Sequence, residues 1–271
     1  MRAGVIGHPI SHSLSPRIHR AWIAARGLDA SYDAFDVAPD ALKAFVERHR
    51  GGGILRGVNV TIPHKEGALA LSDVANDAAS RAGAANVLLF RPDGMVEARN
   101  TDGHGLLEAF MIKIPDFDPK TCRVEILGAS GAARGAVAAF VAEGNTHIVI
   151  ANRTDEKAQA LAKAFGVATQ PWANPKISPG TEVVINATSM GLGGTPSPQL
   201  QWPPPSGPGV ALDMVYNAPG FLADAQRMGW KTVDGVEMLI GQAAPSFEAF
   251  FDAPPPENYR TLALAALEAP P

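Results

Sequence analysis

The stretch Gly128-Ala129-Ser130-Gly131-Ala132-Ala133 follows an apolar run at 123–127 and opens a helical pattern at 131–143. A glycine-rich turn between a strand and a helix lets the backbone approach a pyrophosphate, which the N–H groups of the helix N-terminus can bind. The pattern of three glycines is incomplete, because Ser130 and Ala133 stand at the second and third glycine positions. By itself the stretch indicates either a dinucleotide-binding loop or an ordinary turn from a strand into a helix.

The next predicted strand, at 147–151, ends in Asn152-Arg153-Thr154. An enzyme that uses NAD usually carries Asp or Glu about 20 residues after the glycine turn, where the carboxylate binds the ribose hydroxyls. An arginine at this place pairs instead with the 2′-phosphate of NADP, and Asn and Thr can hydrogen-bond that phosphate. The sequence therefore favours NADP over NAD, and Asp155 is interpreted as an acidic first-turn residue of the next helix.

Short strands and helices alternate along the chain, which is typical of an α/β fold with a mostly parallel sheet. Strands are predicted at 5–6, 30–37, 57–60, 84–90, 123–127, 147–151, 182–186 and 210–213. Helices are predicted at 14–26, 41–49, 105–111, 131–143, 156–165, 236–251 and 259–267, and the Pro-rich segment 196–208 is expected to be irregular. We expect two α/β domains: an N-terminal domain over 1–102, joined by the C-terminal helices of about 236–271, and a Rossmann-like domain over 103–235.

Bulk composition excludes several classes of protein. The chain has 271 residues, 46% hydrophobic and 18% charged, so a packed globular protein is expected rather than a disordered one. The net charge of -4 argues against a nucleic-acid partner, which would need a clustered basic surface. The single cysteine, Cys122, excludes a disulfide framework and argues against a cysteine-based metal site. No signal-peptide pattern opens the chain and no apolar run is long enough for a membrane span, so we expect a cytoplasmic protein without a membrane partner.

Two polar clusters follow strand-like runs in the first part of the chain. Lys65 comes shortly after Asn59-Val60-Thr61, and Asn100-Thr101-Asp102-Gly103 forms the second cluster. A lone lysine on the first turn of a helix is usually a solvated surface residue. In open α/β sheets, however, ligands bind beyond the carboxyl ends of the strands. Lys65 and Asp102 together offer a cation and a carboxylate, the minimum for a proton-transferring pair.

Ser13 and Ser15 alternate across Leu14, just before a predicted helix with Pro16 in its first turn. In an extended segment the two hydroxyls point the same way, and together they could bind a carboxylate. The alternative is that one of the serines simply caps the helix.

Taken together, these motifs resemble the shikimate/quinate dehydrogenase family, and the match runs over nearly the whole chain. The motifs that carry the resemblance are, in chain order, His12-Ser13-Leu14-Ser15-Pro16 with Ile18-His19, Asn59-Val60-Thr61 with Pro63 and Lys65, Gly83-Ala84 with Asn86, Asn100-Thr101-Asp102-Gly103, Gly128 to Arg134, Asn152-Arg153-Thr154, Asn186-Ala187-Thr188-Ser189 with Gly191, Asp213 with Tyr216, and Met238-Leu239 with Gln242. Several ordered motifs at compatible spacing are far more specific than any single one.

The resemblance implies NADPH-dependent reduction of 3-dehydroshikimate to shikimate, a step of chorismate and aromatic amino acid biosynthesis. It implies that the N-terminal domain binds substrate, with Lys65 and Asp102 as the catalytic pair and Ser13 and Ser15 on the substrate carboxylate. The further substrate-binding residues that it implies are Thr61, Asn86, Tyr216 and Gln242. The NADP-binding residues that it implies are Asp77, Gly128, Ala129, Ser130, Gly131, Ala132, Asn152, Arg153, Thr154, Thr188, Met190, Met214 and Gly235.

Three departures from the family pattern leave the identity of the substrate undecided between members of the family. Ser130 replaces a usual glycine, Val87 stands where Thr is common, and 217–222 lacks the Thr usually found near it. A quinate or dual quinate/shikimate dehydrogenase is the first alternative, followed by a methylenetetrahydrofolate dehydrogenase and a non-catalytic nucleotide sensor. The paired serines with Asp102 fit a small polyhydroxy acid better than a folate, and no basic helix-turn-helix pattern supports a sensor. Either a monomer or a homodimer is compatible with the sequence, and no metal site is expected.

Overall fold

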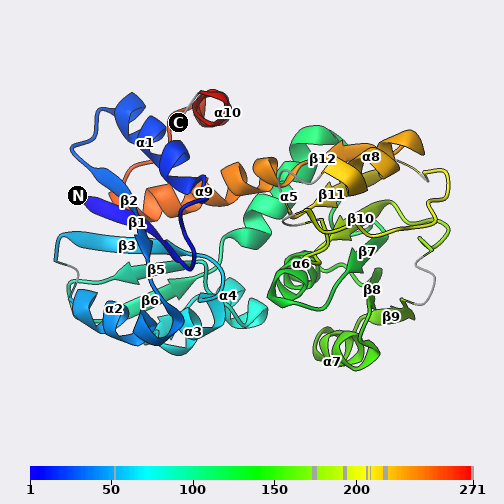
Figure 1. The fold of residues 1–271 in the computed structure, drawn as a ribbon, viewed down its shortest axis with the longest axis horizontal. Coiled ribbons are helices and arrows are strands. Elements are labelled where there is room, and N and C mark those ends of the chain that lie inside the picture. The colour runs from blue at the N-terminus through cyan, green and yellow to red at the C-terminus, as the bar shows by residue number, and fades with distance from the viewer. Residues whose placement is uncertain are drawn as a thin grey trace. The chain divides into compact units, whose positions relative to one another are not determined.

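The structure, a computed structural model, describes residues 1–51, 53–172, 176–191, 194–205, 207, 209–215 and 219–269. By its internal contacts the chain divides into two compact units, whose elements are labelled in Figure 1. Unit 1 comprises Met1–Asp102 and Leu239–Pro271, and unit 2 comprises Gly103–Met238. The α/β fold class expected from the sequence is confirmed, with one sheet in each unit.

Unit 1 contains a six-stranded sheet in the order β2-β1-β3-β5-β6-β4. β1 pairs in parallel with β2 and β3, and β4 pairs in parallel with β6. β5 runs antiparallel to both β3 and β6, so the sheet is mixed, with parallel pairings in the majority. The strands are β1 (Arg2–Gly7), β2 (Ser31–Asp36), β3 (Leu55–Val60), β4 (Val74–Ala75), β5 (Val87–Phe90) and β6 (Val96–Arg99).

The antiparallel pair β5–β6 follows from the short connection between the two strands. A parallel connection needs a crossover of a dozen or more residues, whereas the chain turns back here within 91–95. Gly94 takes the positive φ of 87° that this turn requires, and the Arg91 N–H donates to the Met95 carbonyl at 2.9 Å. β6 was not predicted from the sequence because four residues are too few for its alternation of apolar and polar side chains to give a clear strand pattern.

The helices of unit 1 cover both faces of its sheet. On one face, Leu42 and Val46 of α2 and Ala68 of α3 pack with Val58 and Val60 of β3. Figure 1 shows α1, α9 and α10 on the opposite face, where α1 and α10 contact each other. The helices are α1 (Ser15–Arg26), the 3₁₀ helix η1 (Pro39–Ala41), α2 (Leu42–His49), α3 (Lys65–Ala70), α4 (Asp77–Ala82), α9 (Gly235–Phe251), which belongs to unit 1 from Leu239 onward, and α10 (Tyr259–Glu268).

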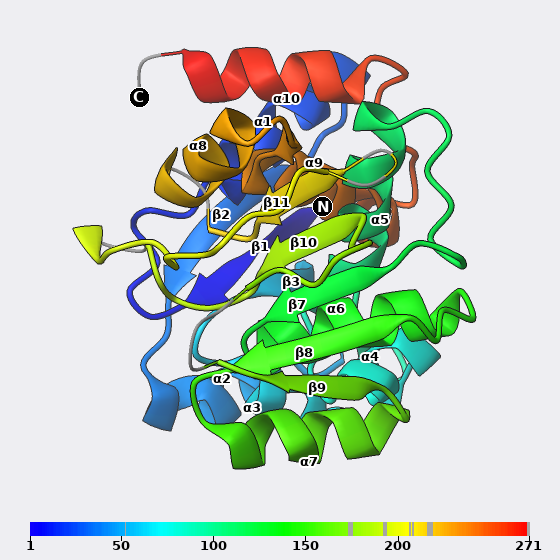
Figure 2. The same cartoon turned by 90° about the vertical axis from the view of Figure 1, so that its right-hand side faces the viewer.

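Unit 2 contains a second six-stranded sheet, in the order β12-β11-β10-β7-β8-β9, and every pairing in it is parallel. From β7 the chain builds β8 and β9 toward one edge and then returns to β10 on the other side of β7, as Figure 2 shows. Ligands of open α/β sheets bind beyond the carboxyl ends of the strands at such a switch point. The strands are β7 (Val124–Leu127), β8 (Ile148–Asn152), β9 (Ala168–Pro171), β10 (Val183–Asn186), β11 (Val210–Asp213) and β12 (Lys231–Val233).

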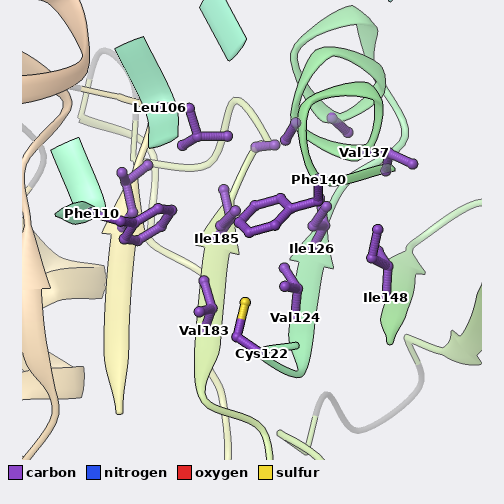
Figure 3. Close-up of a cluster of buried hydrophobic side chains, with 14 of the residues drawn as sticks. Leu106, Phe110, Cys122, Val124, Ile126, Val137, Phe140, Ile148, Val183 and Ile185 are labelled. Atoms are coloured by element: carbon purple, nitrogen blue, oxygen red, sulfur yellow. The ribbon is translucent and has the colours of Figure 1, made fainter. Parts of the chain in front are cut away.

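The core of unit 2 forms between its sheet and the helices α5 (Asp102–Lys113), α6 (Gly131–Ala142) and α7 (Asp155–Phe165). In Figure 3, Phe140 of α6 lies between Ile126 of β7 and Ile185 of β10. Cys122 is buried in the same core, and burial raises the pKa of its thiol to about 12. Cys122 therefore behaves as a small apolar residue rather than a reactive thiol. On the opposite face, α8 (Pro219–Arg227) contributes Phe221 to a second apolar cluster.

Several short elements were not predicted from the sequence, namely β4, β6, β9, β12, α4 and α8. The strand predicted at 84–90 begins only at Val87, because α4 ends at Gly83 with a φ of 64° and the chain must turn first. The described residues of 196–208 contain no helix or named strand, in agreement with the irregular segment expected there.

Candidate active site

Lys65 is the first residue of α3 and follows the short turn after β3. The side chain of His64 is buried, and its Nε2 lies 2.6 Å from the main-chain oxygen of Val37. The carbonyl of Lys65 accepts a hydrogen bond from the Ala85 N–H at 2.8 Å. The backbone is therefore fixed at Lys65 and just before it, so the lysine side chain starts from a defined position.

The ammonium group of Lys65 donates to Oδ2 of Asp102 at 2.6 Å. Asp102 opens α5, where the positive end of the helix dipole favours a carboxylate. The Asp102 N–H donates to Oδ1 of Asn100 at 2.9 Å, which fixes the start of the helix. The side chains of Lys65 and Asp102 are 32% and 19% exposed, so the pair is held in place and still accessible to a ligand.

Asn86, directly before β5, connects this ion pair to the rest of the site. Its Nδ2 donates to Oγ1 of Thr101 at 2.9 Å, to Oδ1 of Asp102 at 3.0 Å and to Oε1 of Gln242 at 3.2 Å. Its Oδ1 accepts from the Thr101 N–H at 2.8 Å. The two amide hydrogens of Asn86 are shared among three acceptors. One of these acceptors can therefore bond to a ligand instead, while Asn86 keeps a partner for each hydrogen.

Gln242, on α9, is held from two sides within unit 1. Its Nε2 donates to the Leu239 carbonyl at 2.8 Å, and its main-chain carbonyl accepts from Oγ1 of Thr101 at 2.9 Å. The structure thus brings together four of the predicted site residues and adds Thr101, for which no role was predicted from the sequence. These residues form what we call the polar cluster: Lys65, Asn86, Thr101, Asp102 and Gln242.

The predicted serine pair lies at the start of α1. Leu14 occupies the N-cap position of this helix and no side chain caps it, so the capping alternative for Ser13 or Ser15 is wrong. Ser13 and Thr61 are half-buried, and neither hydroxyl has a hydrogen-bond partner within the part of the chain that the structure describes. Their hydroxyls are therefore available to a ligand.

A buried phenol, missed from the sequence, lies behind Ser15. Tyr32 is fully buried and its hydroxyl donates to Oδ1 of Asn59 at 2.6 Å, while Nδ2 of Asn59 donates to the Asn86 carbonyl at 3.4 Å. Burial raises the pKa of Tyr32 well above its ordinary value, against the opposing hydrogen bond with Ser15. The phenol therefore stays neutral and supports both the serine segment and Asn86.

In unit 2, the glycine turn after β7 has the geometry of an anion-binding loop. Gly128 has a φ of 112°, and a Cβ there would lie 2.9 Å from the Ala187 carbonyl, so only glycine fits. Ser130 stands at the N-cap position of α6, but its hydroxyl donates to the Ala187 carbonyl at 3.0 Å instead of capping the helix. The first-turn N–H groups at Gly131 and Ala132 are thus left for a ligand, at residues that are exposed.

The segment Asn152-Arg153-Thr154 lies beside this turn, because β7 and β8 pair in parallel and the Gly128 N–H donates to the Ala151 carbonyl at 2.7 Å. Arg153 and Thr154 are exposed, and no acidic partner of Arg153 is found among the described residues. The guanidinium and the glycine turn can therefore contact one anionic ligand from two sides. This donor set fits the two phosphate sites of NADP.

Thr188, Met190, Met214 and Gly235 follow the carboxyl ends of β10, β11 and β12, on the same edge of the sheet as the glycine turn. A Cβ on Gly235 would lie 3.2 Å from the Met214 carbonyl, so the backbone segments at these two residues pack closely. Unit 2 therefore gathers all of the predicted cofactor residues except one: Gly128, Ala129, Ser130, Gly131, Ala132, Asn152, Arg153, Thr154, Thr188, Met190, Met214 and Gly235.

Two predicted site residues are not gathered in this way. Asp77 opens α4 in unit 1, and its side chain is 95% exposed, 3.8 Å from Arg81. No described contact joins Asp77 to another predicted cofactor residue. Tyr216 lies outside the described residues.

The described part of the chain contains no group of three His, Cys, Asp or Glu side chains that could hold a metal ion. Within the same residues, no helix combines the length and the apolar character that crossing a membrane would require.

Comparison with known proteins finds similar proteins over nearly the whole chain. Residues 5–88 match the family model described as the shikimate dehydrogenase substrate binding domain, and residues 112–191 match that of shikimate / quinate 5-dehydrogenase. The chain is 51% identical to the shikimate dehydrogenase (NADP(+)) of Caulobacter vibrioides, over 97% of this chain and 95% of that protein. It is 41% identical to the protein of the same name from Paracoccus denitrificans, over 93% and 91% of the two chains.

A solved structure agrees with these relatives. The shikimate 5-dehydrogenase of Thermus thermophilus, in complex with NADP(H) and shikimate, superimposes with a TM-score of 0.84 at 33% identity, covering 98% of this chain and 99% of that one. The likeness thus extends over both units. This chain belongs to the shikimate dehydrogenase family.

Proposed function

We propose that this protein catalyses the reversible, NADP-dependent reduction of 3-dehydroshikimate to shikimate. The observation that carries the proposal is the polar cluster, in which Lys65 lies 2.6 Å from Asp102 and Asn86 links Asp102 to Gln242. It occurs in a chain 51% identical to an NADP-dependent shikimate dehydrogenase. The reaction is a step of aromatic amino acid biosynthesis, and we place the enzyme in the cytoplasm, as a monomer or a homodimer.

Unit 1 supplies the substrate-binding residues in this proposal, apart from Tyr216, whose position in the sequence belongs to unit 2. The substrate has a carboxylate, ring hydroxyls and a ring ketone, which need hydroxyl and amide partners. Ser13 and Ser15 bind the carboxylate, since the Ser13 hydroxyl has no partner among the described residues and Ser15 opens α1. The groups proposed to contact the ring hydroxyls are Thr61, Asn86, Asp102, Tyr216 and Gln242.

Unit 2 supplies the cofactor-binding residues. The uncapped first turn of α6 binds the pyrophosphate, and Arg153 with Asn152 and Thr154 binds the 2′-phosphate. When bound, NADPH supplies the hydride that reduces the ketone. Asp77 is retained as a cofactor-side residue, on the family resemblance alone.

Lys65 stabilises the charge that develops on the ketone oxygen. Its ammonium group donates a hydrogen bond, and then its proton, to the oxygen as the ketone becomes an alcohol. Asp102 accepts a hydrogen bond from the Lys65 ammonium at 2.6 Å and so orients that donor. The neutral amine then recovers a proton from solvent, which the partial exposure of the pair permits.

The test is NADPH consumption on addition of 3-dehydroshikimate, with NADH and 3-dehydroquinate in parallel arms. We expect rapid turnover with NADPH and 3-dehydroshikimate, and much slower turnover when either is replaced. Comparable turnover of 3-dehydroquinate would move the protein to the quinate branch of the family. The absence of turnover in every arm, from folded protein, would refute the proposed function.

A further inference from the structure

Behind the proposed cofactor site, two buried side chains bond the ends of β10 and β11 together. Asn186 is the last residue of β10 and Asp213 the last residue of β11, and the strand register places them opposite each other. Neither has any exposed surface. Nδ2 of Asn186 donates to Oδ1 of Asp213 at 3.0 Å. We call the two side chains the brace.

Asn186 uses its remaining hydrogen-bonding capacity on the loop that follows β10. Its Oδ1 accepts from Oγ1 of Thr188 at 2.7 Å and from the Thr188 N–H at 3.2 Å. Its Nδ2 also lies 3.3 Å from the Met190 carbonyl, and the Met190 N–H donates to Oγ1 of Thr188 at 3.1 Å. One buried amide thus fixes both residues of this loop that are proposed to meet the cofactor.

Asp213 holds the second loop. Its Oδ1 accepts from the Val215 N–H at 3.0 Å, and the Met214 N–H donates to the Asn186 carbonyl at 3.0 Å. Both hydrogen bonds to the Asp213 side chain end on Oδ1, whereas Oδ2 is buried without a partner among the described residues. A buried carboxylate with one unpaired oxygen is costly for stability alone, which favours a role in the site.

We propose that Asn186 and Asp213 are positioning residues that hold Thr188, Met190 and Met214 in the arrangement that binds NADP(H). This inference rests on the proposed function for the identity of the cofactor. Among the described residues, no hydrogen bond joins either brace side chain to the glycine turn or to Arg153, so the brace acts on the two loops and not on the groups proposed to bind the phosphates.

The test is NADPH binding to the full-length protein, followed by NADPH fluorescence without any second substrate. Asn186→Ala removes all the side-chain bonds to the loop, and we expect the dissociation constant of NADPH to rise on the order of tenfold, as for the loss of one or two net hydrogen bonds. Asp213→Leu should act in the same direction. Asp213→Asn keeps an acceptor at the Oδ1 position, so binding should stay within about threefold of wild type.

Asn145 provides a matched control in the same unit. It is buried, donates to the carbonyls of Pro119 and Cys122 at 2.7 and 2.9 Å, and accepts from the His147 N–H at 2.7 Å. It ties the segment before β7 to the segment before β8, away from the carboxyl ends of the strands. Asn145→Ala should therefore lower stability and leave NADPH binding at the wild-type value wherever the protein is folded.

Wild-type binding by Asn186→Ala, or equal losses in Asn186→Ala and Asn145→Ala, would overturn the inference. If Asn186→Ala does not fold, the contrast between Asp213→Asn and Asp213→Leu decides, and equal binding by these two variants would refute it. Failure of the proposed function would give a different result: a wild-type protein that binds NADPH but does not turn over 3-dehydroshikimate. A wild-type protein that does not bind NADPH would overturn both.

Discussion

The polar cluster of unit 1 and the glycine-turn region of unit 2 differ in whether their polar groups are hydrogen-bonded within the protein. In the polar cluster each side chain is bonded to another one, as Lys65 is to Asp102 and Asn86 is to Gln242. In unit 2 the first-turn N–H groups of α6 have no side-chain cap, and the described residues offer Arg153 no acidic partner. A chemical step needs hydrogen-bond donors that are held in position before the substrate binds. A phosphate supplies only acceptor oxygens, so its binding site needs N–H donors that have no partner within the protein. The two regions therefore suit chemistry and cofactor binding, respectively.

The largest effect is expected at Lys65. Lys65→Ala removes the cation beside Asp102, and we expect kcat to fall by about 10²–10⁴-fold, the usual contribution of a general acid. NADPH binding should be nearly unchanged, because the proposed cofactor residues near the glycine turn lie in unit 2. Steady-state kinetics with 3-dehydroshikimate measures this. Lys43→Ala, at an exposed position of α2, is the control and should keep wild-type kcat. Normal turnover by Lys65→Ala would remove its assigned role.

A smaller effect is expected at Arg153. Arg153→Gln removes the cation proposed for the 2′-phosphate, so the preference for NADPH over NADH in kcat/KM should fall by about 10–100-fold. The loss should come mainly from a higher KM for NADPH, with the KM for 3-dehydroshikimate unchanged. Arg227→Gln is the control in the same unit, since Arg227 pairs with Asp224 at 2.5 Å on α8. An unchanged cofactor preference in Arg153→Gln would show that another group binds the 2′-phosphate.

The units also differ in how buried titratable groups respond to acid. Burial lowers the pKa of His19, in unit 1, to about 3 and raises the pKa of Asp213, in unit 2, to about 6. Between pH 6.5 and 3 the unfolded chain binds a proton at His19 that the folded chain does not, so this group lowers stability as pH falls. For Asp213 the folded chain binds a proton between pH 6 and 3.8 that the unfolded chain does not. The contribution of Asp213 to the free energy of unfolding therefore rises as pH falls through this range.

The His19 contribution can be isolated by substitution. Between pH 6.5 and 3 the free energy of unfolding should fall by about 1.4 kcal/mol per pH unit because of this group, and His19→Leu should lose that part of the slope. Urea unfolding across a pH series measures it. His12→Gln, at an exposed position, should keep the wild-type slope. Identical slopes in wild type and His19→Leu would contradict burial of a neutral imidazole.

The smallest effect is expected at Ser130. Its hydroxyl bonds the Ala187 carbonyl and leaves the helix uncapped, so the first-turn N–H groups are as available as they would be with glycine. Ser130→Gly should change the KM for NADPH by no more than about threefold, the loss of one exposed hydrogen bond. Initial-rate measurement with varied NADPH checks this, and a change of tenfold or more would mean that Ser130 contacts the cofactor directly.

The sequence predicted those parts of the fold that local pattern determines. The helix at 131–143 and the strand at 123–127 match α6 and β7 within one residue at each end, because an apolar run, a glycine turn and a helical pattern follow each other directly. β6 and α8 were missed because short or weakly periodic segments become regular only through their neighbours.

The candidate site shows the same limit. Lys65 and Asp102 could be proposed as a pair, since both follow strand ends of one sheet. Tyr32 could not be foreseen, because its contact with Asn59 reaches from β2 to β3 across β1 and depends on the sheet order. The brace likewise depends on the register that places Asn186 opposite Asp213. Contacts set by strand order and register leave no local signal in the sequence.

The division of roles between the units is tested most directly by NADPH binding to Lys65→Ala and Arg153→Gln, measured side by side by fluorescence without substrate. The division predicts that Lys65→Ala binds NADPH within about twofold of wild type, while Arg153→Gln binds on the order of tenfold more weakly. Equal weakening in both variants, or weakening in Lys65→Ala alone, would contradict it.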